Sequence, residues 1–223
     1  MQAIYINLLN FLLILNFSPT LTLGSVDNFN TAAAQYFESK GLTISPPRLL
    51  GEFLGLPGVQ INNTGSLDEI IAQVKLDHPE WKPSTDLEQH GAPRNIDHLR
   101  SRASTSQMFA QQYTCYPTFA SARTFSELVP FARNQLTLAG TNIVYMDAHS
   151  CGRLARFGDA GIWICYLGDR DNWGSPSLYY IGTCVDYIAQ QCLQDWDPRI
   201  GTGYVSGQLV DSDQWSVAVF KDG

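Results

Sequence analysis

The chain has 223 residues, a formal net charge of −7, and 44% hydrophobic and 16% charged residues, a composition typical of a globular protein with one large or two small domains. A protein that binds nucleic acid needs a basic face to replace counterions, and no run of Lys or Arg provides one. The same observation excludes a polybasic membrane-surface patch, so neither nucleic acid nor a charged lipid surface is an expected partner.

The first 24 residues have the pattern of a secretory signal peptide. Residues 8–17 form an apolar core of the length that such a peptide requires, too short to span a bilayer. Thr22 and Gly24 are small residues at positions −3 and −1 of a signal-peptidase site, which predicts a cut before Ser25. The alternative is a retained anchor. We expect a secreted, extracellular product without a membrane span, in an oxidising environment where cysteines form crosslinks.

Residues 25–77 are predicted to form a small helical region, and they contain no cysteine. Apolar residues recur at helical spacing in 27–40, a second helix is expected after the two prolines in 46–54, and Ser66 with Glu69 forms a capping box that opens a third. Asn62 begins an Asn-Asn-Thr glycosylation sequon, which we expect in the loop between the second and third helices.

Residues 78–107 are polar, contain three prolines and show neither helical nor strand periodicity, which predicts a linker. Within it, Arg100 and Arg102 precede small residues, and Arg102 is a candidate site for a basic-specific processing protease. Two interpretations of the region before Arg102 therefore stay open. It is either a pro-segment, removed or retained, that assists folding, or a permanently attached helical domain.

Residues 108–223 contain all five cysteines and are predicted to form a disulfide-bonded α+β domain. Two amphipathic helices on one face of an antiparallel sheet would bury both sets of apolar residues. We thus predict a C-terminal antiparallel sheet with two helices packed on one face, preceded by a small helical pro-segment. The expected elements, in order, are a helix from 124 or 126 to 140, strands at 142–146, 153–157 and 162–167, a helix capped by Thr183, and a closing hairpin of 204–210 and 215–220.

The cysteines are limited by helix geometry. Cys184 and Cys192 are eight residues apart on one predicted helix, about 12 Å between Cα atoms, whereas a disulfide needs under about 7 Å. That pair is excluded. Cys151 and Cys165 lie near opposite ends of the first predicted hairpin and could face each other, but the sequence does not fix the register. We expect at least one of Cys115 and Cys151 to bond to the helix that carries Cys184 and Cys192. The odd thiol is buried, reactive or paired between chains.

Asp147, His149 and Cys151 alternate, so an extended strand would place them on one face. This arrangement suggests a metal trio or a Cys–His pair, but a structural zinc site needs four ligands, and a catalytic thiol is not consumed in a bridge. We favour a loop with a crosslinked cysteine, and expect no metal, no cofactor and no catalytic residue. The alternative is a small secreted hydrolase that uses Asp147 or His149 with an aspartate.

Exposed aromatic residues offer a second kind of site. Trp163 and Trp215 occupy alternating strand positions and are expected in the core. Trp173 and Trp196 lie in polar stretches and are the candidates for binding a protein or a glycan.

Several of these features recur together in one class of proteins. They are Cys115 before a helix, Cys151 and Cys165 around a hairpin with Gly158, the pair Cys184 and Cys192, and a Gly-rich closing hairpin with Trp215. The arrangement resembles small secreted cysteine-rich proteins of filamentous fungi. It is most similar to their necrosis-inducing extracellular effectors and to the killer-toxin-like α/β sandwiches. The resemblance covers about the last half of the chain, and an odd cysteine count departs from the even number usual there, which leaves the bridge pattern open.

The resemblance implies a non-enzymatic toxin or effector that binds a protein or glycan on a host or competitor cell. It carries over no catalytic residues. An extracellular glycan-binding protein remains a further alternative.

Overall fold

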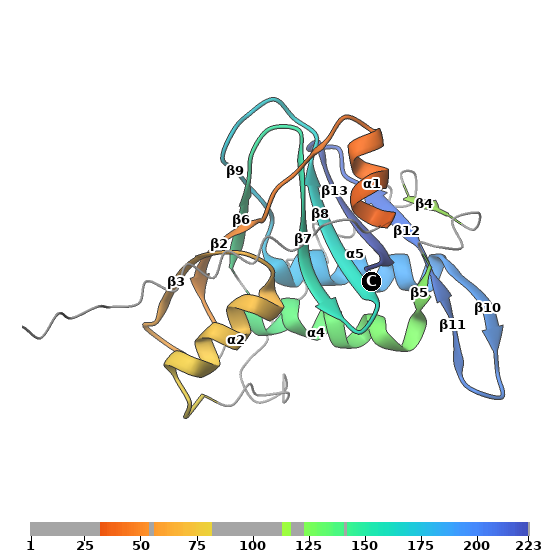
Figure 1. Cartoon of the computed structure of the whole chain (residues 1–223), viewed down its shortest axis with the longest axis horizontal. Helices are drawn as coiled ribbons and strands as arrows, with labels where there is room; N and C mark the ends of the chain where they lie inside the picture. The colour runs from red at the N-terminus through yellow and green to blue at the C-terminus, as the bar shows by residue number, and fades with distance from the viewer. Residues whose placement is uncertain (1–31, 54–55, 82–112, 117–122, 141, 223) are drawn as a thin grey trace, which may run out of the picture.

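The computed structural model describes residues 32–53, 56–81, 113–116, 123–140 and 142–222 (Figure 1). A six-stranded sheet lies at the centre, in the order β1-β7-β8-β13-β12-β4. β1 runs parallel to β7, and the other neighbouring strands pair antiparallel. The strands are β1 (Thr43–Ile44), β4 (Tyr113–Cys115), β7 (Ser150–Phe157), β8 (Ala160–Tyr166), β12 (Gly207–Val210) and β13 (Trp215–Lys221).

The predicted hairpin of β7 and β8 is confirmed, with a shorter turn. A turn over 158–161 was expected, but Phe157 pairs with Ala160, so only Gly158 and Asp159 connect the strands. Gly158 has φ of 60°, and two-residue turns with positive φ match the twist of paired strands.

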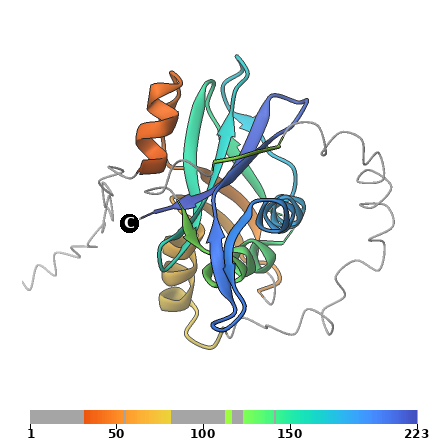
Figure 2. The same ribbon diagram turned by 90° about the vertical axis from the view of Figure 1, so that its right-hand side faces the viewer.

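Two helices cover one face of this sheet, as predicted (Figure 2). They are α4 (Val129–Ala139), which follows the short 3-10 turn η3 (Ser126–Leu128), and α5 (Leu178–Gln191). α5 begins five residues before the predicted cap. Ser177 is the actual N-cap and accepts a hydrogen bond from the Tyr180 amide, whereas the Thr183 hydroxyl donates to the Tyr180 carbonyl inside the helix.

α1 (Ala32–Ser39) covers the opposite face, where Ala33, Ala34 and Phe37 pack on Trp163 and Phe220. β8 is consequently buried on both sides. Its alternate residues enter separate cores, Ile162 and Ile164 on the α4–α5 side and Trp163 and Cys165 on the α1 side, which is why the strand shows no polar alternation.

The helix expected over residues 46–54 is wrong, because this segment forms strand β2 (Arg48–Glu52). Leu49 pairs with Val144 and Leu50 with Ile143, and Gly51 has φ of 140°, a conformation that a helix cannot contain. A short apolar run fits either element, and pairing with distant strands decides it here. β2 joins β3 (Gln60–Thr64), β6 (Ile143–Met146) and β9 (Trp173–Gly174) in a second sheet ordered β3-β2-β6-β9.

α2 (Leu67–Asp77) begins at the predicted capping box of Ser66 and Glu69. Its buried side chains, including Leu67 and Ile70, belong to the same core as α4 and α5. The region expected to be purely helical therefore supplies two helices and three strands to the body of the fold.

The strand expected at 204–210 divides at Ser206. Its second half is β12 of the central sheet, and its first half is β11 (Thr202–Val205), which pairs with β10 (Leu193–Asp197) and β5 (Thr124–Phe125) in a third sheet. The β10–β11 hairpin extends away from the body of the molecule, at the lower right of Figure 1.

Two disulfides connect these elements. Cys115–Cys192 joins β4 to the end of α5, Cys151–Cys165 joins β7 to β8, and Cys184 is free and buried. The exclusion of a Cys184–Cys192 pair and the expected bond to this helix are both confirmed.

The described helices include none with the length and apolarity needed to traverse a bilayer. The signal peptide, most of the predicted linker and Arg102 lie outside the described residues.

Candidate functional site

Three loops meet at one end of the central sheet, at the top of Figure 1: residues 147–149, 167–172 and 211–214. Backbone hydrogen bonds connect them. The His149 amide donates to the Gly168 carbonyl at 3.3 Å, and the Leu167 amide donates to the Gln214 carbonyl at 2.7 Å. The loops therefore support one another.

Each of these loops contains a residue other than glycine with positive φ: His149 at 49°, Asn172 at 58° and Gln214 at 62°. Such residues are uncommon and often lie at ligand sites, where the surrounding structure holds them in place. Gly168 is constrained as well, because a Cβ there would lie 2.4 Å from the Tyr166 hydroxyl. The loop conformations are thus tightly specified.

A cleft of about 610 Å³ opens between loops 167–172 and 211–214, and we call it the loop-end cleft. Buried Tyr166 and Trp173 form its inner side, with rings stacked at 4.7 Å and an interplanar angle of 3°. Trp173 was expected in a polar loop. It lies instead on β9, 9% exposed, between Tyr166 and Trp215. The outer lining is polar: Asp169, Arg170, Ser212, Asp213 and Gln214.

His149 contacts an aspartate at the edge of this cleft. Its Nε2 lies 2.8 Å from Asp169 Oδ1, and the imidazole is about half exposed. Asp147, His149 and Cys151 do not share a strand face, because residues 147–149 turn between β6 and β7. Cys151 is oxidised, so the favoured expectation of a loop with a crosslinked cysteine is confirmed. Within the described ranges, no group of three or more His, Cys, Asp or Glu side chains is arranged to hold a metal ion.

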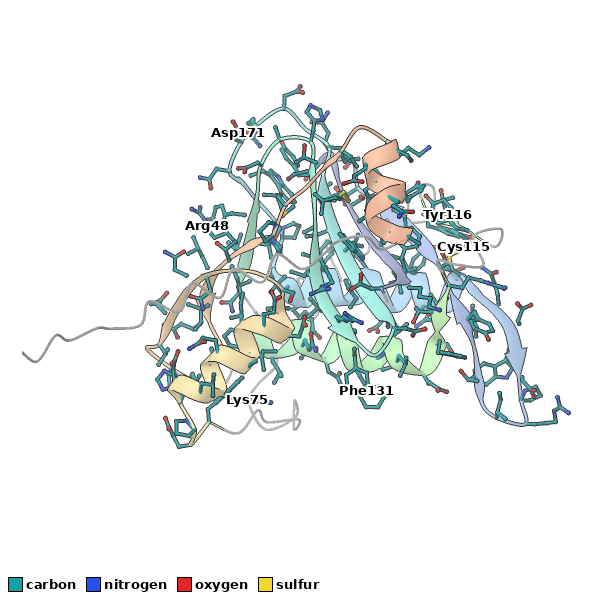
Figure 3. The ribbon with its side chains drawn as sticks, viewed as in Figure 1. Arg48, Lys75, Cys115, Tyr116, Phe131 and Asp171 are labelled. Atoms are coloured by element: carbon teal, nitrogen blue, oxygen red, sulfur yellow. A yellow bond between two sulfur atoms is a disulfide. The ribbon has the colours of Figure 1, made fainter. Side chains whose placement is uncertain are left out.

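Arg48 of β2, in the N-terminal region of the chain, also contacts these loops. Its Nη2 donates to Asn172 Oδ1 at 2.6 Å, and its guanidinium lies over the Tyr145 ring at 5.1 Å. Asp171 Oδ1 accepts a hydrogen bond from the Ala148 amide. Figure 3 shows Asp171 at this end of the molecule, above Arg48. These contacts cross long sequence separations, and no local pattern predicts them.

A second surface lies on the β10–β11 hairpin, and we call it the hairpin surface: Leu193, Trp196 and Ile200. Trp196 is 52% and Ile200 70% exposed. Trp196, the other candidate from the sequence, is therefore available to a partner.

The base of the hairpin is fixed by aromatic and charged contacts. Arg123 pairs with Asp195 and lies over the Tyr204 ring, which packs on Phe125 at 5.1 Å between centroids. At its tip, Asp197 accepts hydrogen bonds from the Arg199 side chain and from the Arg199 amide. Both lower the pKa of Asp197, the side-chain bond more than the amide bond.

An apolar groove of about 370 Å³ lies between α2 and α4, lined in part by Ile71, Lys75 and Leu138. Phe131, labelled in Figure 3, stacks on Phe157 at its border with ring centroids 4.7 Å apart. Sequence reasoning placed both phenylalanines in the right elements but gave no sign that their side chains are partly exposed.

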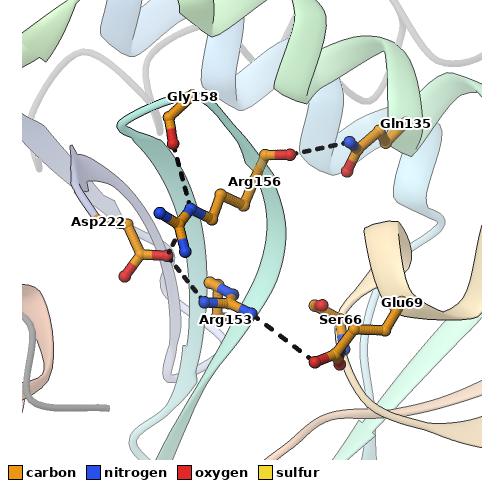
Figure 4. Close-up of polar contacts among 7 residues, drawn as sticks. All are labelled: Ser66, Glu69, Gln135, Arg153, Arg156, Gly158 and Asp222. Carbon is orange, nitrogen blue, oxygen red and sulfur yellow. Dashed lines mark hydrogen bonds and ion pairs between the residues drawn. The ribbon is translucent and has the colours of Figure 1, made fainter. Parts of the chain in front are cut away.

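A buried ion pair joins the end of the chain to β7 (Figure 4). The Asp222 side chain is fully buried, and its Oδ2 lies 3.1 Å from Arg153 Nη1, while Glu69 of α2 lies 3.9 Å from Arg153 Nη2. Arg156 also approaches Asp222, at 4.0 Å. Buried charges require such partners, so this cluster ties α2, β7 and the segment after β13 together.

The predicted glycosylation residue Asn62 is exposed, but it lies on the edge strand β3 and not in a loop as expected.

The free cysteine is held in its protonated form. Burial raises the pKa of the Cys184 thiol to about 12, and the Asp211 charge adds to this shift. A thiol that stays protonated is a poor nucleophile, so the odd cysteine is of the buried kind.

Comparison of the chain with protein-family models, curated proteins and solved structures finds no match.

Proposed function

We propose that this protein is a secreted effector or toxin-like protein that binds a target on another cell through the hairpin surface. The observation that carries the proposal is the exposure of Trp196 on a hairpin that extends from the fold. Tryptophan is enriched among residues that dominate binding energy, and apolar side chains gathered on an exposed element are typical of contact surfaces.

The charges around Trp196 indicate the chemistry of the partner. Asp195 and Asp197 flank it, with the Asp195 carboxylate 65% exposed, and the whole chain carries a net charge of −7. Each of these carboxylates already has an arginine partner, Arg123 for Asp195 and Arg199 for Asp197, so the charges beside Trp196 are balanced. An extracellular protein with an apolar pocket bordered by neutral polar side chains complements this surface.

Export is supported by the disulfides. Bridges persist in oxidising compartments, and Cys115–Cys192 and Cys151–Cys165 connect separate elements of the fold. Intact-mass measurement of the exported product, with and without reductant, tests whether the bridges form, because reduction of two bridges adds four hydrogens to the mass.

Binding of fluorescently labelled protein to plant protoplasts and yeast cells tests the main proposal. We expect Trp196→Ala to weaken cell binding by about thirtyfold, the effect of losing a hot-spot aromatic residue. Leu76→Ala is the matched control, because Leu76 is 74% exposed but lies on α2. Equal binding by wild type and Trp196→Ala, or an equal loss in the control, would refute the proposal.

A second candidate is a small secreted hydrolase, favoured by the 2.8 Å contact between His149 and Asp169 beside the loop-end cleft. Asp169 would orient the imidazole as a general base. Incubation with labelled glycans and peptides tests it, since product formation must disappear in His149→Ala.

A further inference from the structure

We propose that the loop-end cleft is a binding site for a neutral oligosaccharide, separate from the hairpin surface. The loops that border the cleft and the β10–β11 hairpin lie at opposite ends of the molecule in both views (Figures 1 and 2). The site thus goes beyond the proposed cell-binding role of Trp196 and can be tested independently of it.

The outer lining of the cleft has the groups that sugar hydroxyls need. Asp169 and Asp213 offer carboxylate oxygens, Gln214 an amide, Ser212 a hydroxyl and Arg170 a guanidinium. Each sugar hydroxyl is both a donor and an acceptor of hydrogen bonds, so a mixture of these groups can satisfy both capacities.

The inner side of the cleft is closed by two buried aromatic rings, so a sugar would be held by the polar rim and not by stacking on a ring face. Tyr166 and Trp173 are held by mutual stacking, and Trp173 is further backed by Trp215. The volume of about 610 Å³ lies within the range of small-molecule sites.

The rim is formed before any ligand arrives. The Asp213 amide donates to Asp211 Oδ1 at 2.9 Å, and the Gln214 amide donates to the Asp211 carbonyl at 3.2 Å, which closes the 211–214 turn. The opposite loop is held by Arg48 through Asn172. Because the rim is already ordered, the protein loses less conformational entropy when a ligand binds.

Charge selects the kind of saccharide. The two carboxylates Asp169 and Asp213 outnumber the single guanidinium of Arg170 in the lining. A uronic acid or sulfated sugar would be repelled, whereas an uncharged one would not.

The experiment measures binding of four soluble tetrasaccharides to the full disulfide-bonded protein by isothermal titration calorimetry. Three are neutral, made of β-linked glucose, β-linked N-acetylglucosamine or α-linked mannose, and the fourth is tetragalacturonate. We expect at least one neutral probe to bind at least tenfold more tightly than tetragalacturonate.

Asp213→Ala should weaken that binding by about tenfold, the effect of one lost charged hydrogen-bond partner. Asp77→Ala is the matched control, because it removes an aspartate from the far end of α2. Trp196→Ala should leave the sugar affinity unchanged, and Asp213→Ala should leave cell binding unchanged, so either site can fail without the other.

The proposal is overturned if no neutral probe binds at millimolar concentration, or if tetragalacturonate binds best. It is equally overturned if a tetra-arginine peptide binds better than every sugar, which would make the cleft a site for basic peptides. Equal sugar binding by Asp213→Ala and wild type would also reject it.

Discussion

The Phe37 ring lies 5.7 Å from the Trp163 ring, centroid to centroid, and both side chains are fully buried. One belongs to α1, near the start of the described chain, and the other to the middle of β8. Nearby, Gly152 of β7 lies against the segment after β1, because a Cβ there would lie 2.5 Å from the Ser45 carbonyl. The N-terminal region is therefore part of the same packed body as the cysteine-rich sheet.

Phe37→Ala should destabilise the protein by about 3 to 5 kcal/mol, because it removes a buried ring and leaves a cavity beside Trp163 and Phe220. Urea unfolding monitored by circular dichroism measures the change. Glu38→Ala, at an exposed position on the same helix, should stay within about 0.5 kcal/mol of wild type. A small effect at Phe37 would show that α1 is not held on the sheet.

Cutting the chain between residues 81 and 113 should leave the two pieces together. β1 pairs with β7, β2 with β6, and Glu69 approaches Arg153, so buried contacts join the pieces. The first cysteine in the sequence is Cys115, so no disulfide can hold them. After cleavage at an introduced site for a sequence-specific protease, we expect co-elution on gel filtration and separation in urea without reductant. A C-terminal piece that elutes without its partner and still unfolds cooperatively would instead support a removable pro-segment.

Asp222→Ala should cost about 3 kcal/mol or more, because it removes the nearest carboxylate from the buried Arg153 guanidinium. Thermal or urea unfolding measures this effect. The double variant Arg153→Met with Asp222→Leu should be less destabilised, since it removes both buried charges, and Glu69 and Arg156, which lose a partner, are partly exposed to water. If the double variant is the less stable of the two, the ion pair contributes net stability and our account of it is wrong.

Cys184 gives the protein a defined alkaline sensitivity. Burial raises the thiol pKa from 9.0 to about 12, so above pH 9 the unfolded chain loses this proton while the folded chain keeps it. Folding stability must then fall as pH rises, by about 1 kcal/mol between pH 9 and 10 from this group. The difference in unfolding free energy between wild type and Cys184→Ala should shrink by that amount, and a constant difference would contradict it. Consistently, native protein at pH 8 should resist iodoacetamide, whereas unfolded protein should gain one label.

Local signals in the sequence were sufficient to predict several features of the fold. Gly158 marks the β7–β8 turn, Ser66 with Glu69 marks the start of α2, and helix geometry excludes a Cys184–Cys192 bond. Each of these depends on residues close together in the chain, where spacing and backbone preference decide the outcome.

Other features depend on contacts that no local pattern records. β2 is a strand because Leu49 meets Val144 across the second sheet. The loops around the loop-end cleft are joined by contacts of His149 with Asp169 and of Arg48 with Asn172, and the latter pair is 124 positions apart. Trp173 looked exposed because its neighbours in sequence are polar, whereas its neighbours in space are Tyr166 and Trp215. Only the tertiary fold brings these side chains together.

The pairing of β1 with β7 has a consequence for biosynthesis. Thr43 meets Ser150, and Phe37 rests on Phe220, so these segments wait for partners that follow them by 107 and 183 residues in the sequence. Contacts so distant in sequence slow folding and leave apolar surface exposed meanwhile. We therefore expect the nascent chain to need chaperone protection until β13 has been synthesised.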